Sequence, residues 1–281
     1  MDVGLVIFAT DYSIRPDDLA REAEARGFES LWLPEHTHIP VSRVSAWPGG
    51  PTLPKEYWHT VDPFVALATA AAVTHRLRLA TGICLLVERD PITTAKEVAS
   101  LDHLSGGRVI FGIGGGWTAE EMADHGTDFQ QRWRVLRERV LAMKKLWTED
   151  EPSFEGEFVR FEPCWAWPKP VQRPHPPIVL GSNAKRALER VVDYCDGWMP
   201  IGARTRDLAA DLRELGRLAT ERGRDPDGIV VTLYGAPADA DALRRLRDLG
   251  VRRAVLPLPS ASRDAILPLL DRHAPLVAAV A

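Results

Sequence analysis

A histidine and a carboxylate stand side by side where an apolar run of the sequence ends. The segment LWLPEHTHIP carries Glu35 and His36 directly after its apolar part, with His38 two residues further on. An imidazole can donate a hydrogen bond or a proton to a bound ring, and a neighbouring carboxylate can set its tautomer or its pKa. We therefore expect Glu35 and His36 to be the catalytic residues. The alternative is that the same sequence forms a solvated turn or contains a buried structural histidine.

The pair His36-x-His38 also resembles the first metal-binding pair of amidohydrolase barrels. A hydrolytic zinc site needs further histidine or carboxylate ligands from later strands. The corresponding positions here read Gly181-Ser182-Asn183 and Ile201-Gly202. Because these residues supply too few ligands, we predict no metal site.

A glycine-dense turn follows another apolar run. Its residues are Gly112-Ile113-Gly114-Gly115-Gly116-Trp117. So many glycines lose backbone entropy on folding, and close backbone contact with a ligand, beside Trp117, is the expected compensation. The turn is not a dinucleotide fingerprint, because Trp117 stands where the third glycine should be. A Rossmann-type NAD site is therefore disfavoured.

Two more segments are suited to contact a ligand. Gly82, within Ala80-Thr81-Gly82-Ile83, allows a strand end to bulge or to approach a ligand closely. The turn Gly181-Ser182-Asn183 precedes Lys185 and Arg186, and we expect it to begin a helix whose N–H groups bind an anion. Simple capping of that helix by Ser182 or Asn183 is the alternative.

These segments are positioned by alternating strand and helix signals, about eight of each. Strands are predicted at residues 3–8, 29–33, 77–83, 108–113, 177–181, 197–201, 229–235 and 253–257. Helices are predicted near 17–26, 63–74, 92–104, 131–148, 185–195, 205–222, 238–249 and 263–273. The pattern predicts that residues 1–281 form a single (β/α)8 TIM-barrel domain. The alternative is a doubly wound open sheet. The barrel is favoured because closure removes the exposed strand edges that an open sheet must protect.

In such a barrel the active site lies where the strands end. Two insertions, 35–61 and 152–176, interrupt the regular spacing after the second and before the fifth strand, and the latter contains a hairpin predicted around Gly156. Loops of this length are often functional, so we expect both to cover the site. Their tryptophans indicate an apolar or aromatic small-molecule substrate: Trp47, Trp58, Trp165 and Trp167.

The composition excludes several classes of function. A net charge of -4 without a dense basic run argues against nucleic-acid binding. The first residues show no export signal, and the longest apolar window is too short to span a bilayer. The three cysteines are far apart and lack C-x-x-C spacing. These features predict a soluble, cytoplasmic protein.

Taken together, the motifs resemble the luciferase-like monooxygenase superfamily over almost the whole chain. The segments EH, PITTAKEVASLDHLSGGR and GIGGGW most resemble the oxidoreductases that use the deazaflavin coenzyme F420. The resemblance implies a non-prolyl cis peptide at Gly82-Ile83 behind the tricyclic ring. It also implies Glu35 and His36 near the ring, backbone contacts at Gly114 to Gly116, and a phosphate site at Gly181 to Asn183.

The expected activity is hydride transfer between coenzyme F420 and an organic substrate. An FMN-dependent monooxygenase, supplied with reduced flavin by a partner reductase, is the alternative, and a barrel that binds cofactor without turnover is a distant third. Trp117 stands where sugar-phosphate dehydrogenases of the superfamily carry a glutamate, which argues against that substrate. The superfamily also suggests a homodimer, formed through helices containing TAAAVTHRL and AKEVASLDHL. A strand-end residue adds little to core packing, so we expect His36 to affect turnover more than folding.

Overall fold

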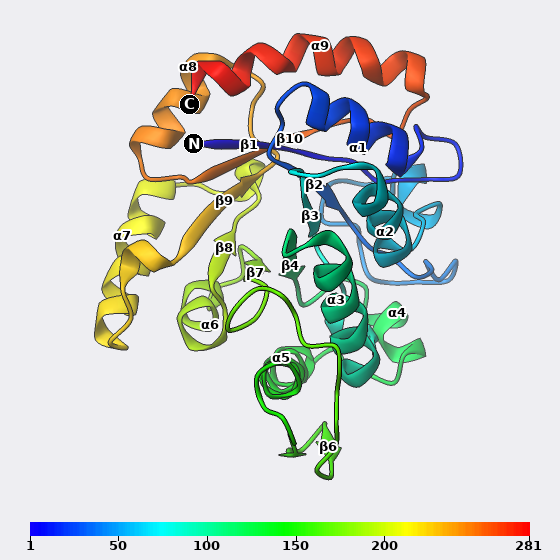
Figure 1. Ribbon diagram of the computed structural model, residues 1–281, viewed down its shortest axis with the longest axis vertical. Helices are drawn as coiled ribbons and strands as arrows, with labels where there is room; N and C mark the ends of the chain where they lie inside the picture. The colour runs from blue at the N-terminus through cyan, green and yellow to red at the C-terminus, as the bar shows by residue number, and fades with distance from the viewer.

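Eight parallel strands close into a barrel in the computed structural model, which describes residues 1–281 (Figure 1). The strand order is β1-β10-β9-β8-β7-β4-β3-β2, and β2 pairs again with β1. No barrel strand is left at an edge, so the predicted (β/α)8 barrel is confirmed over the open sheet. The strands are β1 (Asp2–Val6), β2 (Ser30–Leu33), β3 (Arg78–Thr81), β4 (Val109–Ile113), β7 (Ile178–Gly181), β8 (Gly197–Met199), β9 (Val230–Tyr234) and β10 (Arg253–Pro257).

Helices surround the barrel, as alternating βα units require. They are α1 (Pro16–Ala25), α2 (Pro63–Val73), α3 (Pro91–Ser105), α4 (Ala119–Asp124), α5 (Arg132–Thr148), α6 (Ala187–Tyr194), α7 (Leu208–Glu221), α8 (Ala240–Asp248) and α9 (Arg263–Ala279). The short helix α4 is absent from the predicted set, because six residues are too few to show helical periodicity. Helix α9 continues past the predicted end, with Pro268 and Pro275 inside it.

The amino ends of α2 and α6 differ in how they are capped. The Asp62 carboxylate accepts hydrogen bonds from the backbone N–H groups of Phe64 and Val65 at the start of α2. Helix α6 instead begins at Ala187, and its cap position has no side-chain hydrogen bond. The alternative that Ser182 or Asn183 caps a helix starting near 185 is therefore wrong; residues 182–186 lie before the helix, with a turn at 185–186.

Side chains fill the barrel as well as the layer between strands and helices. Trp32 is fully buried among the residues of the barrel interior: Val6, Ala80, Ile110, Val179, Met199 and Val255. A Cβ atom on Gly4 would lie 2.3 Å from Ser30 Oγ, so this strand position needs glycine. Arg253 donates to both carboxylate oxygens of Glu29, at 2.8 and 2.7 Å, at the amino ends of the strands. The barrel is thus a packed core rather than a channel.

The two insertions lie on different sides of the molecule. Residues 35–61 connect β2 to α2 and contain the 3-10 helix η1 (Lys55–Trp58). The predicted hairpin is present as β5 (Phe154–Glu155) paired antiparallel with β6 (Arg160–Phe161). Figure 1 shows β6 beyond α5, away from the barrel. This insertion connects a helix to the amino end of a strand, so the expectation that both insertions cover the site is wrong for it.

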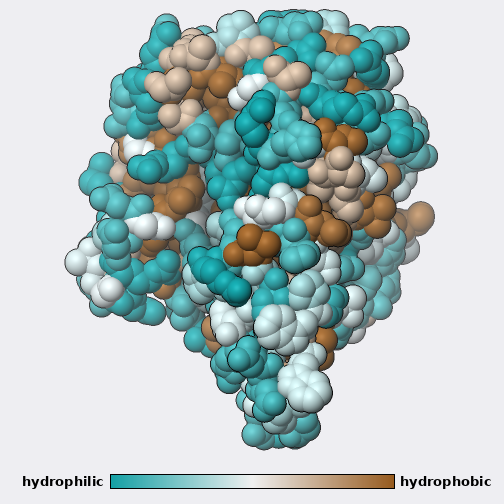
Figure 2. Space-filling model, viewed as in Figure 1, coloured by the Kyte–Doolittle hydropathy of each residue, from teal (hydrophilic) through white to brown (hydrophobic).

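The surface in view is mostly hydrophilic, with apolar residues in separate patches (Figure 2). Trp165 and Trp167 are 79% and 56% exposed. The chain ends meet, since the Met1 ammonium donates to the Val280 carbonyl. No helix combines the length and the apolar character that crossing a bilayer requires.

Candidate active site

A cavity of about 560 Å³ opens at the carboxyl ends of the barrel strands. Its wall includes every residue that the sequence indicated as catalytic or cofactor-binding: Glu35, His36, Gly82, Ile83, Gly114, Gly115, Gly116, Trp117, Gly181, Ser182 and Asn183. These residues follow β2, β3, β4 and β7, except Gly181, which is the last residue of β7. The parallel barrel therefore brings together segments that are up to 148 residues apart in the chain (35 to 183).

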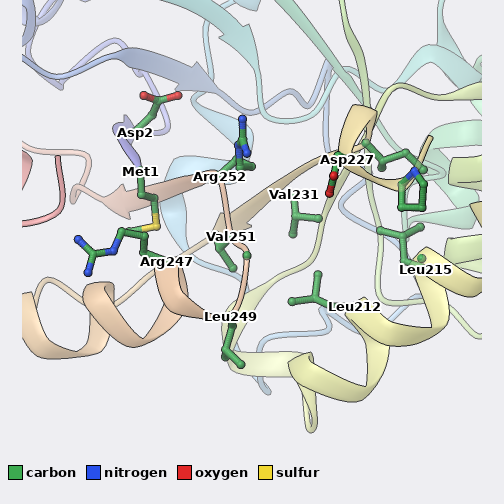
Figure 3. A pocket seen from close by; sticks show the side chains of 14 residues that line it. Met1, Asp2, Leu212, Leu215, Asp227, Val231, Arg247, Leu249, Val251 and Arg252 are labelled. Carbon is green, nitrogen blue, oxygen red and sulfur yellow. The ribbon is translucent and has the colours of Figure 1, made fainter.

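A second cavity of about 600 Å³ lies at the opposite end of the barrel (Figure 3). Its wall includes Met1 and Asp2 at the start of β1 and Arg252 just before β10. Leu212, Leu215 and Val231 form its apolar part, and Figure 3 places the charged ends of Asp2 and Arg247 on the other side. Barrel enzymes carry their chemistry at the carboxyl ends of the strands. We therefore assign the candidate site to the first cavity.

His36 is held by a carboxylate from helix α4. Its Nδ1 lies 2.8 Å from Glu121 Oε2, and the exposed fractions of the two side chains are 6% and 0%. The Nε2 atom has no hydrogen-bond partner in the protein and is available to a ligand. The rings of Tyr57 and Trp117 lie 5.3 and 5.8 Å from the imidazole. His36 is thus more buried than a strand-end residue was expected to be.

Glu35 faces a different set of groups. Its carboxylate accepts hydrogen bonds from the Leu85 N–H at 2.7 Å and from Arg89 Nε at 2.5 Å. Arg89 also pairs with Asp62 and Glu97, and this surrounding negative charge raises the arginine pKa despite partial burial. Glu35 therefore anchors the segment after β3. The carboxylate that contacts His36 is Glu121, not its sequence neighbour.

Ile83 forms one wall of the cavity and fits between two glycines. A Cβ on Gly114 would lie 2.9 Å from the Ile83 side chain, and one on Gly181 would lie 2.5 Å from it. The Gly82-Ile83 peptide bond is cis, as the resemblance implied. Gly115 leaves room for the Trp133 ring in the same way. The glycines therefore keep this wall close to the backbone.

Aromatic side chains from three parts of the chain form another part of the cavity wall. Trp47 and Tyr57 belong to the first insertion, Phe8 follows β1, and Trp117 follows β4. Tyr57 lies 4.6 Å from Phe8 and 5.6 Å from Trp47 between ring centroids. Of the four tryptophans predicted to contact a substrate, only Trp47 lines the cavity. Trp165 and Trp167 are on the distant insertion, and Trp58 is half exposed elsewhere.

Arginines without carboxylate partners stand near another part of the cavity. Arg132 lines it, and neither Arg132 nor Arg190 forms an ion pair with an acidic side chain. Arg132 Nε and Arg190 Nη1 are buried without a hydrogen-bond partner. Burial, and then the charge of Arg190, lowers the Arg132 pKa; burial is also the main cause of the lowered Arg190 pKa. An anion bound here would offset this repulsion.

The predicted anion turn is tied down by hydrogen bonds of its own. Asn183 Oδ1 accepts from the Ile201 N–H at 2.9 Å, and its Nδ2 donates to Thr205 Oγ1. Ser182 Oγ accepts from the Ala184 N–H at 3.1 Å. Asn183 thus fixes the loop after β7 against the loop after β8, and it also lines the cavity. No cluster of three or more histidine, cysteine or acidic side chains lies close enough to hold a metal ion.

Several wall residues escaped the sequence analysis. Phe8 and Tyr234 follow or end strands, and as isolated aromatic residues they show no motif. Arg132 and Trp133 begin helix α5, and Arg204 belongs to the 3-10 helix η3 (Gly202–Arg204). For Glu121 a signal was present, because it comes soon after the glycine turn. What the sequence did not show was its pairing with a residue 85 positions earlier.

Comparisons with known proteins agree with this architecture. A family model for luciferase-like monooxygenases matches residues 16–264. An uncharacterized protein of Mycobacterium tuberculosis is 43% identical over 278 residues, 98% of each chain. The solved structure of the monooxygenase RslO1 from Streptomyces bottropensis superposes with a TM-score of 0.81 at 21% identity, covering 99% of both chains.

Two relatives name different cofactors. An F420-dependent hydroxymycolic acid dehydrogenase of Mycobacterium tuberculosis is 27% identical over 256 residues, covering 88% of this chain and 66% of that protein. An FMNH(2)-dependent dimethylsulfone monooxygenase of Pseudomonas putida is 30% identical over 155 residues, covering 54% and 42%. The relatives therefore support a flavin or deazaflavin cofactor and leave the choice between the two open.

Proposed function

Because the chain belongs to the luciferase-like monooxygenase family, we propose that it is an oxidoreductase that binds coenzyme F420 and transfers hydride between that cofactor and a small organic substrate. The observation that carries the proposal is the pairing, in one cavity, of a glycine-lined wall around Ile83 with Arg132, which has no carboxylate partner and whose buried Nε has no hydrogen-bond partner. A flat ring with an anionic tail fits both features.

The residues present suit such a cofactor. Ile83 and the backbone at Gly114 to Gly116 and at Gly181 would contact the ring, since side chains at these glycines would collide with the wall. Arg132 would hold a phosphate, and Ser182 and Asn183 line the same cavity. When bound, the deazaflavin supplies the hydride chemistry, and the protein supplies orientation and electrostatics.

His36 would hold or move the proton of the reaction at Nε2. Its Nδ1 faces Glu121, so the ring orientation is fixed by a buried carboxylate, while Nε2 has no competing protein partner. A positioned imidazole of this kind can stabilise or protonate a reacting oxygen. The aromatic wall would exclude water and accept an apolar or aromatic substrate.

FMN-dependent monooxygenation is the second candidate, supported by the FMNH(2)-dependent relative and by the family itself. It requires a partner flavin reductase and consumes oxygen. We further propose a homodimer and a cytoplasmic location, with neither nucleic acid nor membrane as a partner.

Equilibrium binding of coenzyme F420 and of FMN to the cofactor-free protein tests the proposal. We expect tighter binding of F420, and hydride transfer without oxygen consumption when a panel of small apolar alcohols and ketones is supplied. Tighter binding of FMN, with oxygen uptake in the presence of a reductase, would establish the second candidate. Binding of either cofactor without any turnover would identify a non-catalytic cofactor-binding barrel.

A further inference from the structure

A second buried carboxyl group lies behind the cavity wall. Glu88 belongs to the 3-10 helix η2 (Leu86–Glu88) that follows β3, and only 7% of it is exposed. Its Oε1 lies 3.9 Å from the position that a Cβ on Gly116 would take, and Gly116 lines the cavity. One layer of backbone therefore separates the Glu88 carboxyl from the site.

Neither oxygen of this carboxyl has a hydrogen-bond donor in the structure. Glu88 Oε1 and Oε2 are buried and partnerless, and so is Glu121 Oε1, the oxygen that His36 does not use. An ionised carboxylate without donors is very unfavourable in such surroundings, whereas a protonated carboxyl can itself donate a hydrogen bond.

The charged groups around Glu88 favour its neutral form. Burial acts first, the negative charge of Glu121 on α4 second and that of Glu35 third, and together they raise the Glu88 pKa to about 9. Two cations oppose this: Arg89, which is engaged by Glu35, Asp62 and Glu97, and Arg139 on α5, which donates to the Leu86 carbonyl. Neither forms an ion pair with Glu88.

We propose that Glu88 is a positioning residue whose buried carboxyl donates a hydrogen bond to the unpartnered Glu121 Oε1, so that Glu88, Glu121 and His36 form one buried chain leading to the cavity. The chain holds the Glu121 carboxylate in place through both of its oxygens and thereby fixes the ring of His36. Nothing in this arrangement needs a bound cofactor, although its relevance to turnover rests on the role proposed for His36.

The arrangement makes the imidazole of His36 sensitive to the ionisation of Glu88. When Glu88 loses its proton, the hydrogen bond to Glu121 is lost and a negative charge appears in the buried chain. The signals of the His36 ring should then change at alkaline pH.

Nuclear magnetic resonance of the cofactor-free protein, with labelled histidine followed from pH 5 to 10.5, provides the test. We expect a step in the His36 signals between about pH 8 and 10 in the wild-type protein, and no such step in Glu88→Gln, which keeps an N–H donor but cannot ionise. Glu120→Gln is the matched control: this neighbour of Glu121 has a pKa lowered to about 2, mainly by hydrogen bonds from Ser45 and Val44, and does not titrate in the alkaline range. Its spectrum should keep the step.

Two results would overturn the inference: a wild-type protein without the alkaline step, or a step that persists in Glu88→Gln. The first result is obtained with the wild-type protein alone, so it does not depend on whether the variant folds. Because no cofactor is present, neither result bears on the choice between F420 and FMN, while failure of both cofactors to bind would refute the proposed function and leave the buried chain intact.

Discussion

Replacing His36 by Ala should destabilise the fold as well as impair turnover. The imidazole provides the only hydrogen bond that the structure shows to Glu121, whose side chain is fully buried: Oε2 contacts His36, and Oε1 is the oxygen to which Glu88 is proposed to donate. Loss of a hydrogen bond to a charged group costs about 1.5–3 kcal/mol, and a buried charge left unpaired adds to this. We expect a loss of about 2–4 kcal/mol in the free energy of unfolding.

Thermal unfolding followed by circular dichroism measures the loss directly. For a chain of this size about 2–4 °C of Tm corresponds to 1 kcal/mol, so a drop of roughly 4–16 °C is expected. His38→Ala is the control, because His38 pairs with Asp124 at 2.9 Å with exposed fractions of 42% and 61%. Exposed pairs contribute about 1 kcal/mol or less.

The double variant His36→Ala, Glu121→Gln separates the cost of the lost hydrogen bond from the cost of the buried charge that is left unpaired. Replacing the stranded carboxylate with a neutral amide should restore part of the lost stability, so this variant should unfold at a higher temperature than His36→Ala alone. Turnover should fall by about 10²–10⁴ if His36 serves as acid or orienting donor. Equal, small effects of His36→Ala and His38→Ala on Tm would refute the buried pairing.

Three further outcomes are expected. Arg132→Ala should weaken binding of a phosphate-bearing cofactor by about 10- to 100-fold, the equivalent of one charge-assisted hydrogen bond, measured by fluorescence titration against the exposed control Arg134→Ala. Between pH 4.5 and about 9 the folded chain keeps a proton on Glu88 that the unfolded chain has lost, so the contribution of Glu88 to wild-type stability falls as pH rises through this window. Glu88→Gln should remove that slope and gain up to about 3 kcal/mol at pH 7, measured by urea unfolding at several pH values. Light scattering at micromolar concentration should give the mass of a dimer, and a mass near 31.2 kDa would contradict the homodimer.

The sequence was most informative where function depends on the backbone. Gly114 and Gly181 could be assigned to the site because a side chain there would strike Ile83, and such positions appear in a sequence as glycines. The barrel could be predicted for a related reason: buried parallel strands read as short apolar runs, and eight of them with intervening helices leave few topologies.

Side-chain partners were predicted less well. The position of a residue at a strand end fixes where its backbone lies, but it does not show which side chains it contacts. Glu35 and His36 are adjacent in sequence, yet successive residues of an extended chain point in opposite directions. Glu35 therefore turns to Leu85 and Arg89, while His36 meets Glu121. Their adjacency in the sequence suggested a catalytic pair, but the two side chains point to different partners.

The insertions show the same limit in another form. Both are rich in tryptophan, and composition alone assigned both to the substrate. Which end of the barrel an insertion reaches depends on the order of elements around it: residues 35–61 leave a strand and reach the carboxyl-end cavity, whereas 152–176 leave a helix and approach the amino end of β7. This order was already present in the predicted elements. Whether an insertion follows a strand or a helix is therefore a better guide to the residues that line the cavity than its content of aromatic residues. In this protein that order selects Trp47 and Tyr57 over Trp165 and Trp167.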